Sequence, residues 1–140
     1  MNCIVTKINE KDRYMKHVAI FRQPFFNMVL NHEKTIESRW SNKKIAPFKK
    51  VQGADTIWLK ETSKLVTAKA IVARVEYYEL TENIADEINA KYGKQIGIDK
   101  FTNWDEVKRK KYCTLIWLKD VEMVEPFAVS KSHGAGWIVM

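Results

Sequence analysis

One long run of strand-forming residues, at 65–78, limits the folds that this chain can adopt. The run is rich in Val, Ile, Thr and aromatic side chains, and such residues favour β-strands. A strand of that length has to bend or carry a β-bulge, so we expect a curved sheet. Shorter runs of the same character lie at 17–21, 34–40, 56–60, 112–124 and 137–139. About five or six such strands would close into a small barrel.

Segments with helical spacing lie between these strands, at 24–30, 81–92 and 102–111. Pro24 is tolerated in the first turn of a helix, and Thr81 is a residue type that caps helices. We expect the second helix to end before a glycine-containing loop at 93–102, and we expect Pro126 to break the strand that begins at residue 112. Helices inserted among mostly antiparallel strands predict an α+β fold, a small mixed or antiparallel β-barrel with flanking helices.

The length of 140 residues allows one domain with a single core. No repeat or linker divides the chain, so we expect residues 16–140 to form the domain. Residues 1–15 are expected to be an N-terminal extension, either an edge strand or a loose arm. No apolar run is long enough to cross a membrane and no signal core is recognisable. Cys3 and Cys113 lie far apart without metal-ligand spacing, which favours reduced thiols in a cytoplasmic protein.

The chain is basic, with a formal net charge of +7 and a sequence pI near 9.4. A basic excess favours a polyanionic partner such as RNA or DNA, or a negatively charged small molecule. A basic loop at 41–52 and a second basic run at 108–111 are candidates for contacts to nucleic-acid phosphates. In the loop, the candidates are Lys43, Lys44, Lys49 and Lys50. The alternative is that both segments are ordinary solvated surface.

Three ionisable side chains are expected to converge where the first helix gives way to a strand. Side chains alternate between the two faces of a strand, so Glu37 and Arg39 point the same way, toward a groove or solvent. Ile36 and Trp40 form the buried face, and Lys34 at the junction can reach the same pocket. The Arg39 fork suits phosphate or carboxylate, and Glu37 can orient it, bond to a base edge or activate a water. The alternative is a structural salt bridge on an exposed strand.

Further candidate ligand contacts lie elsewhere in the chain. Lys131 and His133 belong to a loop of small residues at 130–136, which permits close approach of a ligand. Tyr77 and Tyr78, near the end of the long strand, are candidates for base stacking. The histidines do not share metal-ligand spacing, so no metal is expected. Neither a glycine-rich phosphate loop nor a serine nucleophile motif is found, and we expect no cofactor.

The segment around the three ionisable residues resembles the hallmark of the ASCH domain family, written G-x-K-x-x-E-x-R. Lys34, Glu37 and Arg39 match its charged positions, and His32 stands where the family usually has glycine. The surroundings are similar as well: a Pro-Phe-Phe start of the preceding helix, a turn at 53–55, a long strand, and a final Gly-Trp-Ile-Val strand. The resemblance extends over residues 16–140.

This resemblance implies a PUA-like β-barrel with a cleft lined by the hallmark residues. The family is thought to bind RNA or nucleotides. Some small members are amidohydrolases that remove the acetyl group of N4-acetylcytidine, and others resemble ribonucleases. In the amidohydrolases a threonine nucleophile occupies the position of Glu37 and a lysine matches Lys34. A glutamate of the following helix, here Glu82 or Glu87, completes that site, but the threonine is replaced in this chain.

Two functions therefore remain open from the sequence. The first is a module that binds RNA, a nucleotide or a nucleoside through Lys34, Glu37, Arg39, Lys131 and His133. The second is a small hydrolase acting on an acylated nucleoside or on RNA, with Lys34 and Glu37 as catalytic residues. A protein-interaction module with an acidic partner is a weaker third hypothesis. The sequence leaves open whether the chain is an enzyme and what its oligomeric state is.

Overall fold

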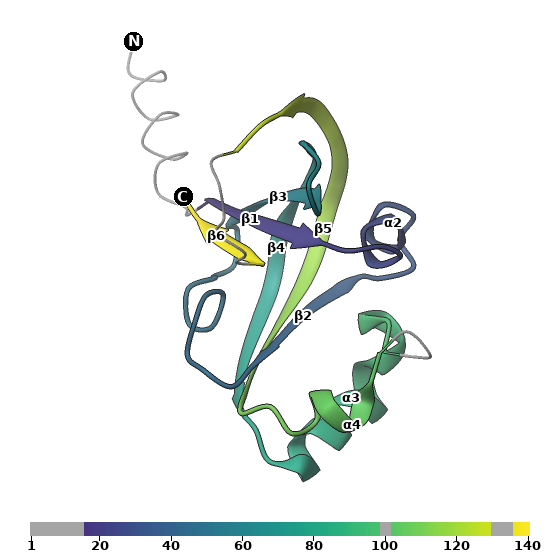
Figure 1. Ribbon diagram of the computed structural model, residues 1–140, viewed down its shortest axis with the longest axis vertical. Coiled ribbons are helices and arrows are strands. Elements are labelled where there is room, and N and C mark those ends of the chain that lie inside the picture. Colours follow the sequence, from purple (N-terminus) through teal and green to yellow (C-terminus); the bar gives the residue numbers. More distant parts are fainter. Residues whose placement is uncertain (1–15, 99–101, 130–135) are drawn as a thin grey trace.

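The computed structural model describes residues 16–98, 102–129 and 136–140, so the expected N-terminal extension at 1–15 lies outside the described residues. The elements follow the chain in the order β1 (Lys16–Phe21), α2 (Phe25–Leu30), β2 (Ile36–Ser41), β3 (Thr56–Glu61), β4 (Val66–Glu79), α3 (Glu82–Ile96), α4 (Trp104–Val107), β5 (Tyr112–Phe127) and β6 (Trp137–Val139) (Figure 1). Each strand expected from residue 16 onward is present.

The strands form one mixed sheet in the order β2-β5-β4-β3-β1-β6. The pair β1 and β3 is parallel, and the other neighbouring pairs are antiparallel. The long strands β4 and β5 carry much of the curvature, because their register shifts at several places and each bulge adds a bend. The sheet curls into a half-barrel, with helices beside it (Figure 1). The expected α+β fold with a small barrel and flanking helices is confirmed.

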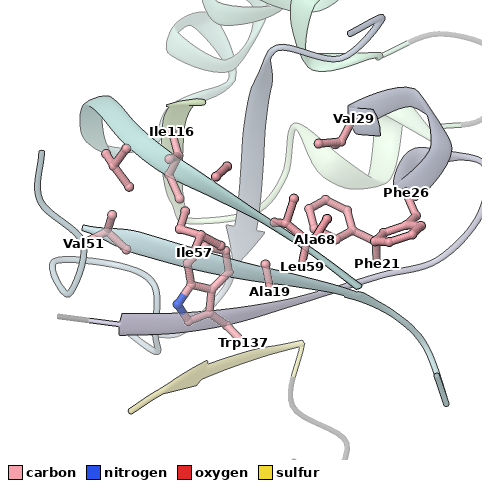
Figure 2. Close-up of a cluster of buried hydrophobic side chains, with 12 residues drawn as sticks. Ala19, Phe21, Phe26, Val29, Val51, Ile57, Leu59, Ala68, Ile116 and Trp137 are labelled. Carbon is pink, nitrogen blue, oxygen red and sulfur yellow. The ribbon is translucent and has the colours of Figure 1, made fainter. Parts of the chain in front are cut away.

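The main hydrophobic core lies inside this curl (Figure 2). Ile57 and Leu59 contribute from β3, and Phe26 and Val29 of α2 pack at one end of the cluster. Trp137 of β6 joins the same cluster although it lies far away in sequence. Burying one side chain of this kind contributes about 1.5–3 kcal/mol, so the core holds α2 and β6 firmly against the sheet.

A second hydrophobic cluster holds α3 beside β2 and β5. Its buried members are Ile36, Ile88, Ile96, Cys113 and Leu115. Because Ile96 is the last residue of α3, this packing places the C-terminal end of the helix next to β2. Within the described ranges, no helix is long and apolar enough to cross a membrane.

The expected end of the second helix is wrong. Thr81 caps α3, its Oγ1 accepting from the N–H of Ile84 at 3.2 Å, but the helix continues beyond residue 92 to Ile96. Gly93 does not break the helix: it is buried within it, where the missing Cβ leaves room for a neighbouring side chain. The helix ends at Gly97, whose φ of 86° lies in the left-handed region that closes many helices.

Two other expected boundaries also differ. The third helix, capped by the Asn103 side chain, spans only Trp104–Val107 instead of reaching residue 111. Strand β5 passes through Pro126 and ends at Phe127. Strand β2 pairs with β5 only from residue 112 to residue 117, so the remainder of β5 has β4 alone as a neighbour. Proline is tolerated in a strand with one open edge.

Candidate functional site

A tight turn between α2 and β2 places Lys34 at the base of the candidate site. The backbone N–H groups of Glu33 and Lys34 both donate to Met28 O, at 2.9 and 3.0 Å, and so finish the helix. The turn holds His32 at a φ of 67°, in the region that glycine adopts with least strain. This gives a physical reason for a glycine at the first position of the hallmark.

The Lys34 ammonium group is buried, and all of its donors are used. Its Nζ donates to Ile36 O at 3.0 Å and to Ile96 O at 2.5 Å, and lies 3.0 Å from Glu37 Oε1. The carbonyl of Ile96 belongs to the C-terminal turn of α3, where the helix dipole favours a positive charge. Burial lowers the pKa of Lys34, and the carboxylate of Glu37 offsets only part of that effect.

The Glu37 carboxylate lies between two cations and is saturated in the same way. Oε1 accepts from Lys34 and from the backbone N–H of Ser38 at 3.0 Å. Oε2 accepts from Arg39, at 2.7 Å from Nε and 2.6 Å from Nη2. Burial alone would raise the pKa of Glu37, but the charges of Arg39 and Lys34 outweigh it and hold the pKa below its ordinary value.

The Arg39 guanidinium joins β2 to the opposite edge of the curled sheet. Nη1 donates to Gly136 O at 2.9 Å, and Nη2 donates to Ile20 O at 3.1 Å. The guanidinium also lies 5.2 Å from the ring centres of both Phe21 and Trp137, within the range of cation–π attraction. One side chain therefore ties β2 to β1 and to the start of β6.

The three hallmark residues converge as strand alternation predicts. The strand was expected to turn Glu37 and Arg39 toward a groove or solvent; both line a cleft, but Glu37 is only 4% exposed. Its neighbours Lys34 and Arg39 supply the hydrogen bonds that make this burial tolerable. The salt bridge of the alternative interpretation exists, but it is buried and connects three parts of the chain.

A cleft of about 820 Å³ opens beside this cluster, within the size range of small-molecule sites. Aromatic rings of Phe21, Phe25 and Trp40 contribute to its walls. Among the described lining residues, Glu37 is the one acidic side chain, whereas the cationic ones are Arg22, Lys34, Arg39 and Lys60. The cleft thus combines aromatic surface with an excess of positive charge.

Comparison with solved structures supports the fold expectation. The chain superposes on an ASCH protein from Zymomonas mobilis with a TM-score of 0.62 at 16% identity, covering 81% of this chain and 73% of that one. This chain has an ASCH-like fold. Variants of the Zymomonas protein match similarly, with TM-scores of 0.60 and 0.62. A hypothetical protein matches at 0.50 with 15% identity, over 79% of this chain and 100% of its own.

No family model and no curated protein sequence matches the chain. The superposition, with a TM-score of 0.62, establishes the ASCH-like fold, whereas an identity of 16% establishes nothing about the ligand. The residues that line the cleft are the basis for a proposal about its ligand.

The predicted phosphate-binding lysines of the ASCH-like domain lie outside the cleft. They are exposed on the loop between β2 and β3: Lys43, Lys44, Lys49 and Lys50. Lys44 lies over the ring of Tyr112 at 5.6 Å. The backbone N–H of Lys111 donates to Ser41 O at 3.1 Å, so the basic run at 108–111 ends beside the start of this loop. The two basic segments therefore meet at one end of the sheet.

The other predicted contacts do not line the cleft. Tyr77 bonds to the backbone of Val51 through its hydroxyl, and the hydroxyl of Tyr78 donates to Glu76. Partial burial raises the pKa of both tyrosines. The two helical glutamates, Glu82 and Glu87, are exposed and absent from the lining residues. The expected ligand contacts Lys131 and His133 lie outside the described residues.

Sequence reasoning missed the cations at the end of the cleft formed by β1 and β3. Arg22 follows β1 directly and Lys60 lies in β3, and both line the cleft. The only local signal was a basic residue near the end of each of two expected strands. Within residues 16–98, 102–129 and 136–140, no group of three His, Cys, Asp or Glu side chains is arranged to hold a metal.

Proposed function

We propose that this ASCH-like domain is a binding module that accommodates a nucleotide, or a nucleotide of an RNA chain, in the cleft beside Lys34, Glu37 and Arg39. The observation that carries the proposal is the composition of the cleft wall. Aromatic surface suits a nucleobase, and cations that outnumber the single acid suit a phosphate. The basic balance of the whole chain supports the same class of ligand.

The bonding of the hallmark residues favours binding over catalysis. Both oxygens of Glu37 already accept hydrogen bonds, and its lowered pKa makes it a weak base. The Arg39 guanidinium is directed at backbone carbonyls of this chain rather than into free space. In the proposed module these residues shape the cleft, and its other lining residues make most of the ligand contacts.

A hydrolase is the second candidate function, and one observation favours it. Burial lowers the pKa of Lys34 at the edge of the cleft, and a lysine of lowered pKa can act as a base. Lys34 would first have to give up a bond to Ile36 O, Ile96 O or Glu37. Incubation with N4-acetylcytidine and short RNAs decides between the two functions. Turnover that Lys34→Met abolishes in a folded variant would establish the hydrolase.

A cleft-blocking variant tests the binding module. Ile138 of β6 lines the cleft, so Ile138→Glu adds a negative charge where the ligand is proposed to lie. Met140→Glu is the matched control, since Met140 is 57% exposed and is not among the lining residues. We expect calorimetric titration with nucleoside monophosphates and short RNAs to detect binding to the wild type and to Met140→Glu. Ile138→Glu should lose at least about tenfold in affinity, which is about 1.4 kcal/mol.

The same titrations at several salt concentrations test the contribution of the loop lysines. If RNA extends from the cleft over the loop lysines, affinity should fall steeply as salt increases, by an amount that grows with the number of phosphates contacted.

Equal binding by wild type and Ile138→Glu would remove the proposed function, because the ligand would then lie elsewhere.

A further inference from the structure

The end of the cleft formed by β1 and β3 carries positive charge that no acidic side chain of the described residues balances. Arg22 and Lys60 line this end, and neither forms an ion pair with a described acidic residue. Arg22 packs its guanidinium over the ring of Phe25 at 5.4 Å, and its N–H donors bond to no group in the described part of the chain. By contrast, both cations of the hallmark form ion pairs with Glu37.

Strand register explains why the two cations share one face. Strands β1 and β3 pair in parallel, with Ile20 beside Lys60. Side chains two residues apart lie on the same face of a strand, so the positions that follow these two, Arg22 and Thr62, extend the same face. All four residues line the cleft. The intervening acid, Glu61, is not a lining residue, and its carboxylate accepts from a glutamine side chain at 3.0 Å.

A hydroxyl group lies at the same end of the cleft as Arg22 and Lys60. Ser63 follows Thr62 in the turn between β3 and β4, lines the cleft and is exposed. The Thr62 hydroxyl donates to Phe21 O at 3.2 Å, whereas the Ser63 hydroxyl forms no hydrogen bond with the described residues. A guanidinium, an ammonium and a free hydroxyl are the donor types that bind phosphate oxygens.

We infer that Arg22, Lys60 and Ser63 form a phosphate-binding corner, and that the cleft therefore selects a phosphorylated nucleotide over the free nucleoside. The phosphate lies at the β1–β3 end, and the sugar and base extend toward the hallmark cluster and Trp40. This inference rests on the proposed function, which it deepens by specifying the chemical group that gives the ligand its affinity. The phosphate can belong to a free nucleotide or to RNA, since both present the same oxygens.

The experiment compares ligands that differ only in the phosphate. Calorimetric titrations use the four common ribonucleosides, their 5′-monophosphates and a short single-stranded RNA, each with the full chain. The variants are Arg22→Gln and Lys60→Gln, which remove one charge each. The matched control is Lys64→Gln, which removes the same charge from an exposed residue of the same turn that does not line the cleft. Circular dichroism verifies that every variant is folded.

We expect at least one phosphorylated ligand to bind about tenfold or more tightly than its nucleoside, as a charged hydrogen-bonded contact allows. Arg22→Gln and Lys60→Gln should each reduce that affinity by about tenfold, leave nucleoside affinity within about twofold, and differ clearly from Lys64→Gln. The arm that shows the effect, mononucleotide or RNA, identifies the source of the phosphate. Equal affinity for nucleoside and monophosphate, unchanged in both variants, would overturn the inference while the proposed function stands. Absence of binding by every ligand would overturn both.

Discussion

The Nη1 atom of Arg39 lies 2.9 Å from the carbonyl oxygen of Gly136. These residues stand at opposite ends of the strand order, Arg39 in β2 and Gly136 directly before β6. No backbone ladder joins β2 to β1 or β6, so the side chain of Arg39, held by Glu37, bridges the opening of the half-barrel. The cluster of Lys34, Glu37 and Arg39 therefore links the two edges of the sheet, and the cleft lies beside this cluster.

Replacing Glu37 by glutamine should destabilise the fold strongly. Glu37→Gln keeps the shape of the side chain but leaves Lys34 and Arg39 without their counter-charge in a buried site. The loss of one partner of a buried ion pair costs about 3–5 kcal/mol, measurable by urea unfolding. The control is Glu122→Gln, whose pair with Lys69 is exposed and should be worth less than about 1 kcal/mol. Similar small losses in both variants would show that the buried cluster is dispensable.

The contribution of Glu37 should disappear in acid. Because the charges around it outweigh burial, the pKa of Glu37 in the folded chain lies below the unfolded value of 4.5. A carboxyl with a lowered folded pKa stabilises fully above its unfolded pKa, and this stabilisation is lost as pH falls toward the folded pKa. The difference in unfolding free energy between wild type and Glu37→Gln should therefore shrink as pH is lowered below about 4.5. A difference that stays constant down to about pH 3 would contradict this assignment.

A methyl group at Gly136 should disturb the bridge without altering any charge. A Cβ built there lies 3.0 Å from Arg39 Nη1, so the guanidinium has to move away from the carbonyl that it contacts. We expect Gly136→Ala to cost about 1–2 kcal/mol, as crowding in a packed site does. Gly53→Ala meets no atom within 4 Å and should be close to neutral in the same thermal unfolding assay. Equal melting temperatures for the two variants would argue against the bridge.

Introducing the glycine of the hallmark should stabilise the chain. His32 has a φ of 67°, a conformation that costs a residue with a Cβ about 1–2 kcal/mol. Glycine also has greater chain entropy in the unfolded state, which offsets part of this gain. The free energy of unfolding of His32→Gly should therefore rise by about 0.5–1 kcal/mol. Glu33 is the next exposed residue and has no positive φ. The free energy of unfolding of Glu33→Gly should therefore fall by a similar amount. Chemical denaturation measures both, and a loss in His32→Gly would show that the turn gains nothing from glycine.

Local sequence pattern was sufficient for part of the fold and for the centre of the site. Strand alternation and the helix-to-strand junction brought Lys34, Glu37 and Arg39 together, and the length of 65–78 required the curvature that β4 and β5 show. The partners of these side chains were not predictable. The partners are backbone carbonyl groups, those of Ile96, Ile20 and Gly136. Every residue has such a group, so a sequence pattern cannot identify which ones act as partners.

The residues that escaped prediction are positioned by long-range pairing. Arg22 and Lys60 meet because β1 lies parallel to β3, with Ile20 opposite Lys60, and nothing local specifies that register. Gly93 was read as a helix breaker, but packing of α3 on β2 overrides the weak helix propensity of one glycine. The basic loop was predictable as a charged segment, whereas its location outside the cleft was not.

Amide chemical shifts distinguish a ligand in the cleft from a ligand on the basic loop. A ¹⁵N-labelled sample is titrated with nucleoside monophosphates and a short RNA. We expect the largest shifts in the amides of the cleft wall: Arg22, Ser38, Lys60, Gly97 and Ile138. Shifts confined to the loop lysines at 43–50 and the run at 108–111, with the cleft amides unmoved, would place the ligand outside the cleft.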